Sequence, residues 1–323
     1  MEFKDFLIKT WEVAKGSIKA REKLKAEGHL EEGQDSLGGF TVPTEAYEDI
    51  MEITLEESIV RPRAQVIKLG SDAVNVPTLT DTSHASSVFG GITCYWTGEA
   101  VDKTEKNPKV GSLGLQANKL VGFVYLSDEW MADVAVENFL EQTFGEAVAY
   151  YADDAYVNGT GVGQPLGILN APATVSVAKE GGQSPDTLLH ENIYKMGSRL
   201  LPQSHKKAIW LAHPDTLPQL GGLTSDVRYI GPGFYILGKE VLWSEKCQTI
   251  GDTGDIMLTD FSKYVIADRG LTISASKHPR FPYDETMWRF VLRTDGQPLL
   301  SSAITPKNGS DSLSPFIKLN ART

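Results

Sequence analysis

The stretch at residues 133–170 constrains the fold of this chain more than any other. Apolar residues recur there at steps of three and four, with acidic and amide residues between them, which predicts an amphipathic helix. The apolar positions are Val136, Phe139, Leu140, Thr143, Ala147, Tyr151 and Ala155. Asp133 is a candidate N-cap, and Asn158-Gly159 is a stop signal. A helix over 133–157 is about 37 Å long, so it can form the spine of a broad, flat domain.

A glycine-rich segment, NGTGVGQPLGILN, follows the predicted helix at 158–170. Phosphate-binding loops lie between a strand and the start of a helix, and many end in Gly-Lys-Ser/Thr. This segment follows a helix and lacks that ending. We therefore interpret it as a structural loop that ends the helix. An α/β enzyme that uses the 158–163 glycines is an alternative.

The chain shows no pattern typical of catalysis. Asp153 and Asp154 are adjacent carboxylates, but neighbours on a helix point in different directions, so we expect a solvated face there. The six histidines are scattered, with no zinc-site spacing: His29, His84, His190, His205, His213 and His278. There is no G-x-S-x-G turn and no EF-hand spacing. We predict no catalytic residue, no cofactor and no metal, and thus no enzyme.

Charge and composition argue against two further classes: proteins that grip DNA through its phosphates and proteins that span a membrane. The net charge is −11, and neither half of the chain has the basic stripe with which proteins grip DNA phosphates. No apolar run approaches the length of a membrane span.

The two cysteines, Cys94 and Cys247, are too few for a disulfide framework. Reduced thiols are one interpretation, and pairing between subunits is the other.

Residues 1–28 form a candidate amphipathic helix, with Phe3, Leu7 and Trp11 on one face and lysines on the remainder. One interpretation is a helix packed on its own body. The other is an arm that contacts a neighbouring subunit or a scaffold. The residues that follow, up to 37, read as a linker.

Residues 71–122 are an unusually long segment rich in Ser, Thr, Gly and Lys, with alternating apolar residues at both ends. Loops of this length inside a compact domain are uncommon and usually functional. As one hairpin, its arms would reach about 65 Å, against a radius of gyration of about 20 Å for a compact chain of this size. The predicted contacts with a partner are Phe89, Tyr95, Trp96 and Lys103.

Mixed helix and strand patterns fill the rest of the chain. Residues 187–278 alternate short helices and strands. Trp288, Phe290 and Leu292 alternate with polar or smaller residues, which predicts a strand, and we expect it to turn at Asp295-Gly296.

The order of these segments resembles that of tailed-bacteriophage major capsid proteins with the Hong Kong 97 fold, from residue 38 to about 319. The resemblance is carried by GGFTVP at 38–43 and the acidic helix pattern after it, by NGTGVGQPLGILN, and by GDIMLTDFSKYVIADRGLTISAS at 254–276. It implies an α+β, Hong Kong 97-like capsid fold. The implied divisions are an N-terminal helical arm and linker at 1–37; a peripheral domain at 38–70, 123–186 and 279–323, with a spine helix at 133–157; an extended loop at 71–122; and an axial domain at 187–278.

The resemblance implies a major capsid protein that self-assembles into the pentamers and hexamers of an icosahedral head. Such a head encloses double-stranded DNA without sequence-specific binding, so the protein belongs to the virion and is assembled in the host cytoplasm. An encapsulin-like compartment for cargo enzymes is the alternative with the same fold. The GGFTVP and NGTGVGQPLGILN segments favour the phage interpretation. The implied partners are further copies of the chain, a portal protein and a scaffolding protein, with no membrane.

Two departures limit what the resemblance implies. Only 37 residues precede Gly38, too few for the helical scaffolding segment of many family members, so we expect a separate scaffolding protein. In the family's best-known branch, a loop Lys forms an isopeptide bond with an Asn of a neighbouring subunit, and a Glu acts as base. Lys103 matches the Lys position, but Met287 and Thr294 stand at the Asn and Glu positions. We therefore expect a shell without covalent links.

Overall fold

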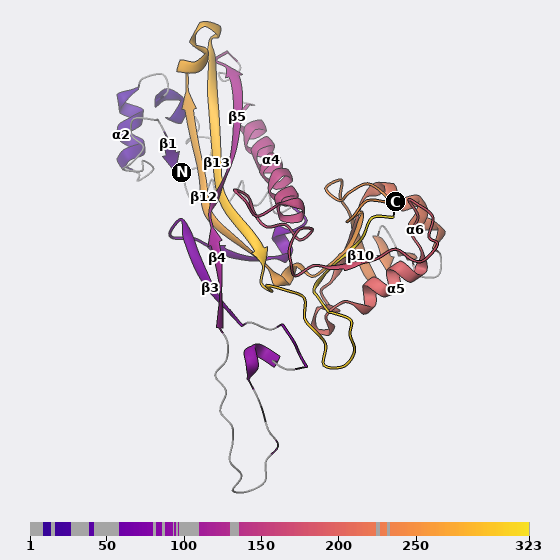
Figure 1. Cartoon of the computed structure of the whole chain (residues 1–323). Helices are drawn as coiled ribbons and strands as arrows, with labels where there is room; N and C mark the ends of the chain where they lie inside the picture. Colours follow the sequence, from indigo (N-terminus) through magenta and orange to yellow (C-terminus); the bar gives the residue numbers. More distant parts are fainter. Residues whose placement is uncertain are drawn as a thin grey trace, which may run out of the picture.

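The computed structural model describes residues 9–13, 17–26, 39–41, 58–79, 82–85, 88–92, 94, 96, 110–129, 136–223, 227–230 and 233–322. Two β-sheets, one long helix and an extended hairpin make up the architecture (Figure 1). The fold class is therefore α+β, as the sequence predicts.

The first sheet has five strands: β1 (Gly39–Thr41), β2 (Gln65–Lys68), β5 (Asn118–Ser127), β12 (Tyr264–Ser276) and β13 (Glu285–Pro298). β12 and β13 form a long antiparallel ladder with a bulge between Asp268 and Gly270. β5 pairs with the other side of β13. β1 and β2 both pair with β12, so this ladder is the frame of the sheet.

The predicted turn at Asp295-Gly296 is wrong. Both residues lie inside β13, where they pair with Ala267 and Ile266 of β12. A Cβ on Gly296 would lie 2.8 Å from the ring of Tyr264, so the glycine allows a close approach instead of a turn. Pairing along the whole ladder overrides the local turn preference of the two residues.

The long helix α4 (Val136–Asn158) lies along one face of this sheet (Figure 1). Trp288, Phe290 and Leu292 alternate along β13 and are buried, because side chains two residues apart point to the same face of a strand. The rings of Phe144 and Phe290 lie 4.8 Å apart between their centroids. The structure confirms the predicted spine helix and its stop, while the candidate N-cap Asp133 lies outside the described residues.

The glycine-rich loop closes back onto the end of α4. The Gly159 amide donates to the Ala155 carbonyl (2.9 Å), and the Ile168 amide donates to the Tyr156 carbonyl (3.0 Å). A Cβ on Gly159 would lie 2.2 Å from the Pro165 carbonyl oxygen. Only glycine therefore fits where the loop folds back against the helix end. The loop thereby pairs carbonyl groups that the helix end leaves unpaired, which confirms its interpretation as a helix-terminating loop.

The expected solvated face at Asp153-Asp154 is wrong for Asp153, whose residue is 1% exposed. Its carboxylate accepts hydrogen bonds from the Ser58 hydroxyl (2.6 Å), the Ile59 amide (2.5 Å) and the Val60 amide (3.4 Å). Burial raises the pKa of Asp153, although these hydrogen bonds oppose the shift. The residue is therefore a structural tie between α4 and the chain that leads into β2.

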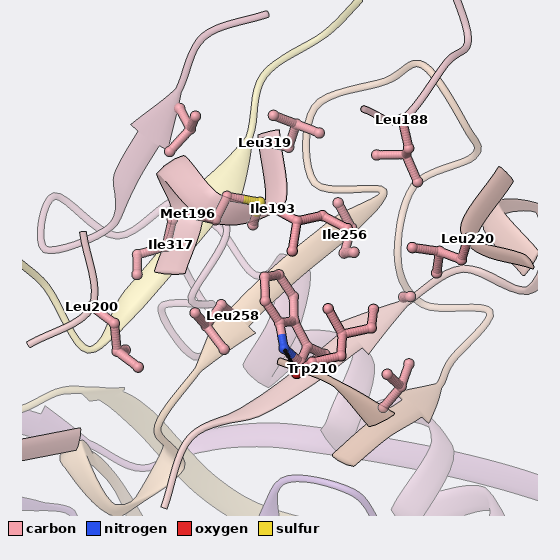
Figure 2. Packing of buried hydrophobic residues seen from close by; sticks show 14 of the residues in the cluster. Leu188, Ile193, Met196, Leu200, Trp210, Leu220, Ile256, Leu258, Ile317 and Leu319 are labelled. Carbon is pink, nitrogen blue, oxygen red and sulfur yellow. Dashed lines mark hydrogen bonds between the residues drawn. The ribbon is translucent and has the colours of Figure 1, made fainter. Parts of the chain in front are cut away.

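The second sheet has seven strands, in the order β6-β14-β11-β7-β10-β9-β8. Their bounds are Val175–Val177 (β6), Ile209–Ala212 (β7), Val227–Ile230 (β8), Gly233–Ile236 (β9), Lys239–Trp243 (β10), Ile256–Thr259 (β11) and Phe316–Leu319 (β14). Figure 2 shows its core, where Trp210 lies among Ile256, Leu258 and Ile193. The Trp210 indole donates to the Ile236 carbonyl (3.0 Å), which satisfies its buried N–H.

The remaining elements are short. The helices are α2 (Ile18–Ala26), α5 (His190–Ser198) and α6 (Leu217–Gly222). The 3-10 helices are η1 (Arg61–Arg63), η2 (Val88–Gly91), η4 (Pro202–Ser204), η5 (Pro214–Thr216), η6 (Phe261–Lys263) and η7 (His278–Tyr283). The two strands of the extended hairpin, β3 (Ala73–Leu79) and β4 (Val110–Gln116), form a separate antiparallel pair.

The strands cross the domain boundaries predicted from the sequence. β12 belongs to the five-stranded sheet, although 187–278 was predicted to be axial. β6 and β14 join the seven-stranded sheet, although their residues were predicted to be peripheral. These pairings link distant parts of the chain, so local sequence patterns do not reveal them.

Candidate assembly interface

The extended hairpin leaves the body of the molecule as a two-stranded ribbon (Figure 1). β3 and β4 pair from Ala73 opposite Gln116 to Leu79 opposite Val110. Only Ala117 separates β4 from β5. The second arm of the hairpin is therefore almost a direct continuation of a strand in the five-stranded sheet.

An apolar cluster anchors the base of the hairpin. Leu115 of β4 packs with Leu69 of the chain before β3, and with Val265 and Ala267 of β12. All four residues are at most 8% exposed. The alternation at both ends of the predicted loop therefore marks the part of the hairpin that packs on the body.

Farther out, several described residues are exposed. Trp96 is fully exposed, Ile92 is 49% exposed and Val110 is 64% exposed. Part of the loop returns to the body, because the His84 amide donates to the Thr305 carbonyl (2.8 Å). An exposed tryptophan on a projecting segment is typical of a contact with another molecule.

The sequence matches the model of the phage capsid family over residues 38–308. The chain belongs to the phage capsid family. The match includes the extended hairpin, the spine helix and nearly all of both sheets. It supports the resemblance to tailed-phage major capsid proteins that the sequence indicated.

The capsid protein has the same fold as several solved structures. A chain from the capsid of a native GTA particle aligns over 91% of this chain and 97% of its own length, with 16% identity and a TM-score of 0.59. A chain of Gordonia phage Cozz aligns over 83% and 87%, with 12% identity and a TM-score of 0.56. A chain of Mycobacterium phage Bobi aligns over 93% and 97%, with 13% identity and a TM-score of 0.54. The fold is Hong Kong 97-like. Comparison with curated proteins gives no match.

The predicted contact residues of this capsid protein lie on the N-terminal arm and on the extended hairpin. Trp96 lies exposed on the hairpin, and the backbone of Phe89 lies in η2. Phe3, Leu7, Tyr95 and Lys103 lie outside the described residues. Trp96 thus remains the contact candidate with a described, exposed side chain.

Trp11 lies against its own chain. It contributes to the environment of Asp128, at the end of β5, and Thr10 beside it is fully buried. Burial raises the pKa of Asp128, but hydrogen bonds from Lys277 and Thr286 outweigh it, so the pKa is lowered. Within the single chain, Trp11 therefore lies near the end of β5, and its role in contacts between subunits stays a prediction.

An exposed apolar row was missed by the sequence analysis. Val121, Phe123 and Tyr125 alternate along β5 and are 42–56% exposed. The guanidinium of Arg280 lies over the Tyr125 ring, 4.7 Å from its centroid. The alternation in NKLVGFVYLS at 118–127 is the sequence signal for this strand. The predicted boundary between the extended loop and the peripheral domain, at 122–123, divides this segment and hides its alternation.

A cleft of about 610 Å³ lies beside α4 and is lined by Tyr150, Tyr151, Lys246, Glu146 and three small side chains. The Lys246 ammonium lies over the Tyr150 ring, 4.4 Å from its centroid. The described residues contain no group of three or more His, Cys, Asp or Glu side chains that could hold a metal ion. Cys94 is exposed, whereas Cys247 is buried and its pKa is raised by burial to about 12. The family and the fold of this chain both point to a structural protein.

Proposed function

We propose that the chain is a major capsid protein that self-assembles into the pentamers and hexamers of an icosahedral phage head. The observation that carries this proposal is the match to the phage capsid family over residues 38–308. The Hong Kong 97-like fold is consistent with it.

The extended hairpin supplies a physical reason for assembly. It projects away from the body (Figure 1), and its Trp96 is fully exposed. An aromatic side chain buries about 150–250 Å² when it enters an interface. Covering Trp96 with a neighbouring subunit would therefore remove apolar surface from water that the single chain leaves exposed.

The charge of the chain is consistent with a shell wall that encloses DNA without gripping it. With a net charge of −11 and no basic stripe, the protein has no means of gripping many phosphates. Double-stranded DNA is then enclosed by the shell without sequence-specific binding. No described helix is long and apolar enough to cross a membrane.

The further partners follow from the same role. A head that packages DNA needs a portal, and a scaffolding protein is the other partner that this role implies. Assembly then takes place in the host cytoplasm, and the product is the virion shell.

Imaging of the expressed full chain tests the proposal. Closed icosahedral shells are the expected result, and a soluble monomer with enzymatic turnover would contradict it. The contents of native particles distinguish a phage head from an encapsulin-like compartment, because the first contains double-stranded DNA and the second contains cargo enzymes.

A further inference from the structure

We propose that Asp72 and three residues of β13, Arg293, Asp295 and Gln297, form a polar clamp that sets the direction in which the extended hairpin leaves the body. This inference rests on the proposed function, since it assigns the clamp a role in positioning the hairpin for contact with a neighbouring subunit. The four residues are called the hairpin clamp below.

The backbone ladder between β5 and β13 stops where the clamp begins. Its last pair is Asn118 opposite Thr294. Beyond this pair the chain passes through Ala117 into β4, which pairs with β3 instead. The backbone of β13 therefore ceases to direct the hairpin at this point, and other contacts must do so.

Side chains of β13 take over from the backbone. The Asp295 carboxylate accepts hydrogen bonds from the Gln116 amide of β4 (2.8 Å) and from its own neighbour, Gly296 (2.8 Å). Two residues farther along, the Gln297 side-chain amide donates to the Gly114 carbonyl (2.5 Å). The period of two on both strands lets these side chains contact alternate backbone groups of β4.

Asp295 is well placed for this role because it is only 9% exposed. It lines a polar cavity of about 200 Å³ together with Gly161 and Gly163 of the loop after α4. Burial raises the pKa of Asp295, although the amides of Gln116 and Gly296 oppose the shift. The hydrogen bonds from β4 thus compensate part of the cost of burying this carboxyl group.

The other arm of the hairpin is held by Asp72. Its carboxylate accepts a hydrogen bond from the Arg293 guanidinium of β13 (2.7 Å). The same carboxylate forms an ion pair with Arg269, which lies at the bulge of β12. Its backbone carbonyl accepts from the Ala117 amide (2.9 Å). Asp72 therefore connects both arms of the hairpin to the two central strands of the sheet.

The ion pairs of Asp72 are suited to orienting the hairpin and contribute little to the stability of the fold. The Asp72 side chain is 69% exposed, and exposed ion pairs stabilise a fold only weakly. The buried apolar cluster around Leu115 already holds the base of the hairpin. Loss of the Asp72 pairs should therefore leave the chain folded while widening the range of hairpin directions.

The test measures hairpin direction in the full-length, unassembled chain. Spin labels are placed at Ser112→Cys on β4 and Tyr151→Cys on α4, both exposed positions, in a Cys94→Ser background. Cys247 is buried and stays unlabelled. The clamp variants are Asp72→Ala and Gln297→Ala. The matched control is Asp311→Ala, which removes a carboxylate that is 71% exposed and pairs with Arg199 (3.0 Å) on the body.

We expect both clamp variants to melt at the wild-type temperature, to show a broadened distance distribution between the labels, and to give a several-fold lower yield of regular shells. The control should match wild type in all three. Unchanged distance distributions in both clamp variants would overturn the inference, and so would broadened distributions with normal shells. If the wild-type chain forms no shells even with its scaffolding protein present, the proposed function fails, while the distance distributions still report on the clamp itself.

Discussion

Ser58 donates a 2.6 Å hydrogen bond from its hydroxyl to the buried carboxylate of Asp153, 95 positions later on α4. The same carboxylate accepts hydrogen bonds from the backbone amides of Ile59 and Val60. One side chain of the spine helix therefore fixes the course of the chain just before β2.

Replacing Asp153 with Ala should destabilise the subunit by about 1–3 kcal/mol, because buried donors at 58–60 lose their acceptor. Urea unfolding of the unassembled chain measures this. Asp154→Ala is the control, since that residue is partly exposed and its carboxylate bonds only the Asn158 side chain among the described contacts. Equal losses in the two variants would contradict the role of Asp153.

A second prediction concerns Gly122, which faces the ring of Phe290. A Cβ built at Gly122 would lie 1.8 Å from the Phe290 ring. Gly122→Ala must therefore displace the ring from its contact with Phe144 and should lower the free energy of unfolding by about 1–3 kcal/mol.

Two variants make the Gly122 test specific. Gly114→Ala on β4 is the control, because its Cβ would meet no atom closer than 3.4 Å. The double variant Gly122→Ala with Phe290→Leu should lose less stability than the sum of the single variants. Strict additivity would show that the ring is not the obstacle.

A third prediction concerns the pH dependence of stability through Asp128. Burial raises its pKa, but the hydrogen bonds from Lys277 and Thr286 leave the pKa below the ordinary value of 3.8. A lowered carboxyl pKa stabilises the fold above the unfolded-state pKa, and this contribution is lost as the pH falls through the folded-state pKa.

Asp128→Asn should therefore cost up to about 1 kcal/mol near neutral pH, since the ion pair is partly exposed, and the difference from wild type should shrink below about pH 4. Unfolding in urea across this pH range gives the measurement. Asp284→Asn removes one negative charge at an exposed site nearby and controls for net charge. A difference that persists unchanged in acid would refute the assignment.

The limits of sequence reasoning are visible in individual residues. The spine helix was predictable because its period of three to four residues is local. The burial of Asp153 was not, because its partners lie at 58–60. Asp295-Gly296 has turn chemistry, yet it continues β13 because β12 supplies the pairing. The exposed Trp96 was predicted from the reach of the loop, whereas the hairpin clamp depends on contacts between β13 and residues about 180–220 positions earlier.

The fourth prediction is a shell without covalent links. Met287 offers no carboxamide for attack by Lys103, and a hydroxyl such as that of Thr294 is a poor proton acceptor at neutral pH. The Thr294 hydroxyl is moreover held between the Tyr156 hydroxyl (2.9 Å) and the Asp268 carboxylate (2.7 Å). Particles boiled in detergent should release one band near 35.3 kDa. A ladder that survives boiling and reductant would refute this prediction.

The central claim is that copies of this chain build a closed shell through the extended hairpin. Cryo-electron microscopy of the full chain beside a variant lacking residues 80–110 tests it most directly. We expect icosahedral shells of pentamers and hexamers from the full chain, with residues around Trp96 buried against a neighbouring subunit. The deletion variant should give a folded but unassembled chain. Normal shells from the deletion variant, or shells in which Trp96 faces solvent, would contradict it.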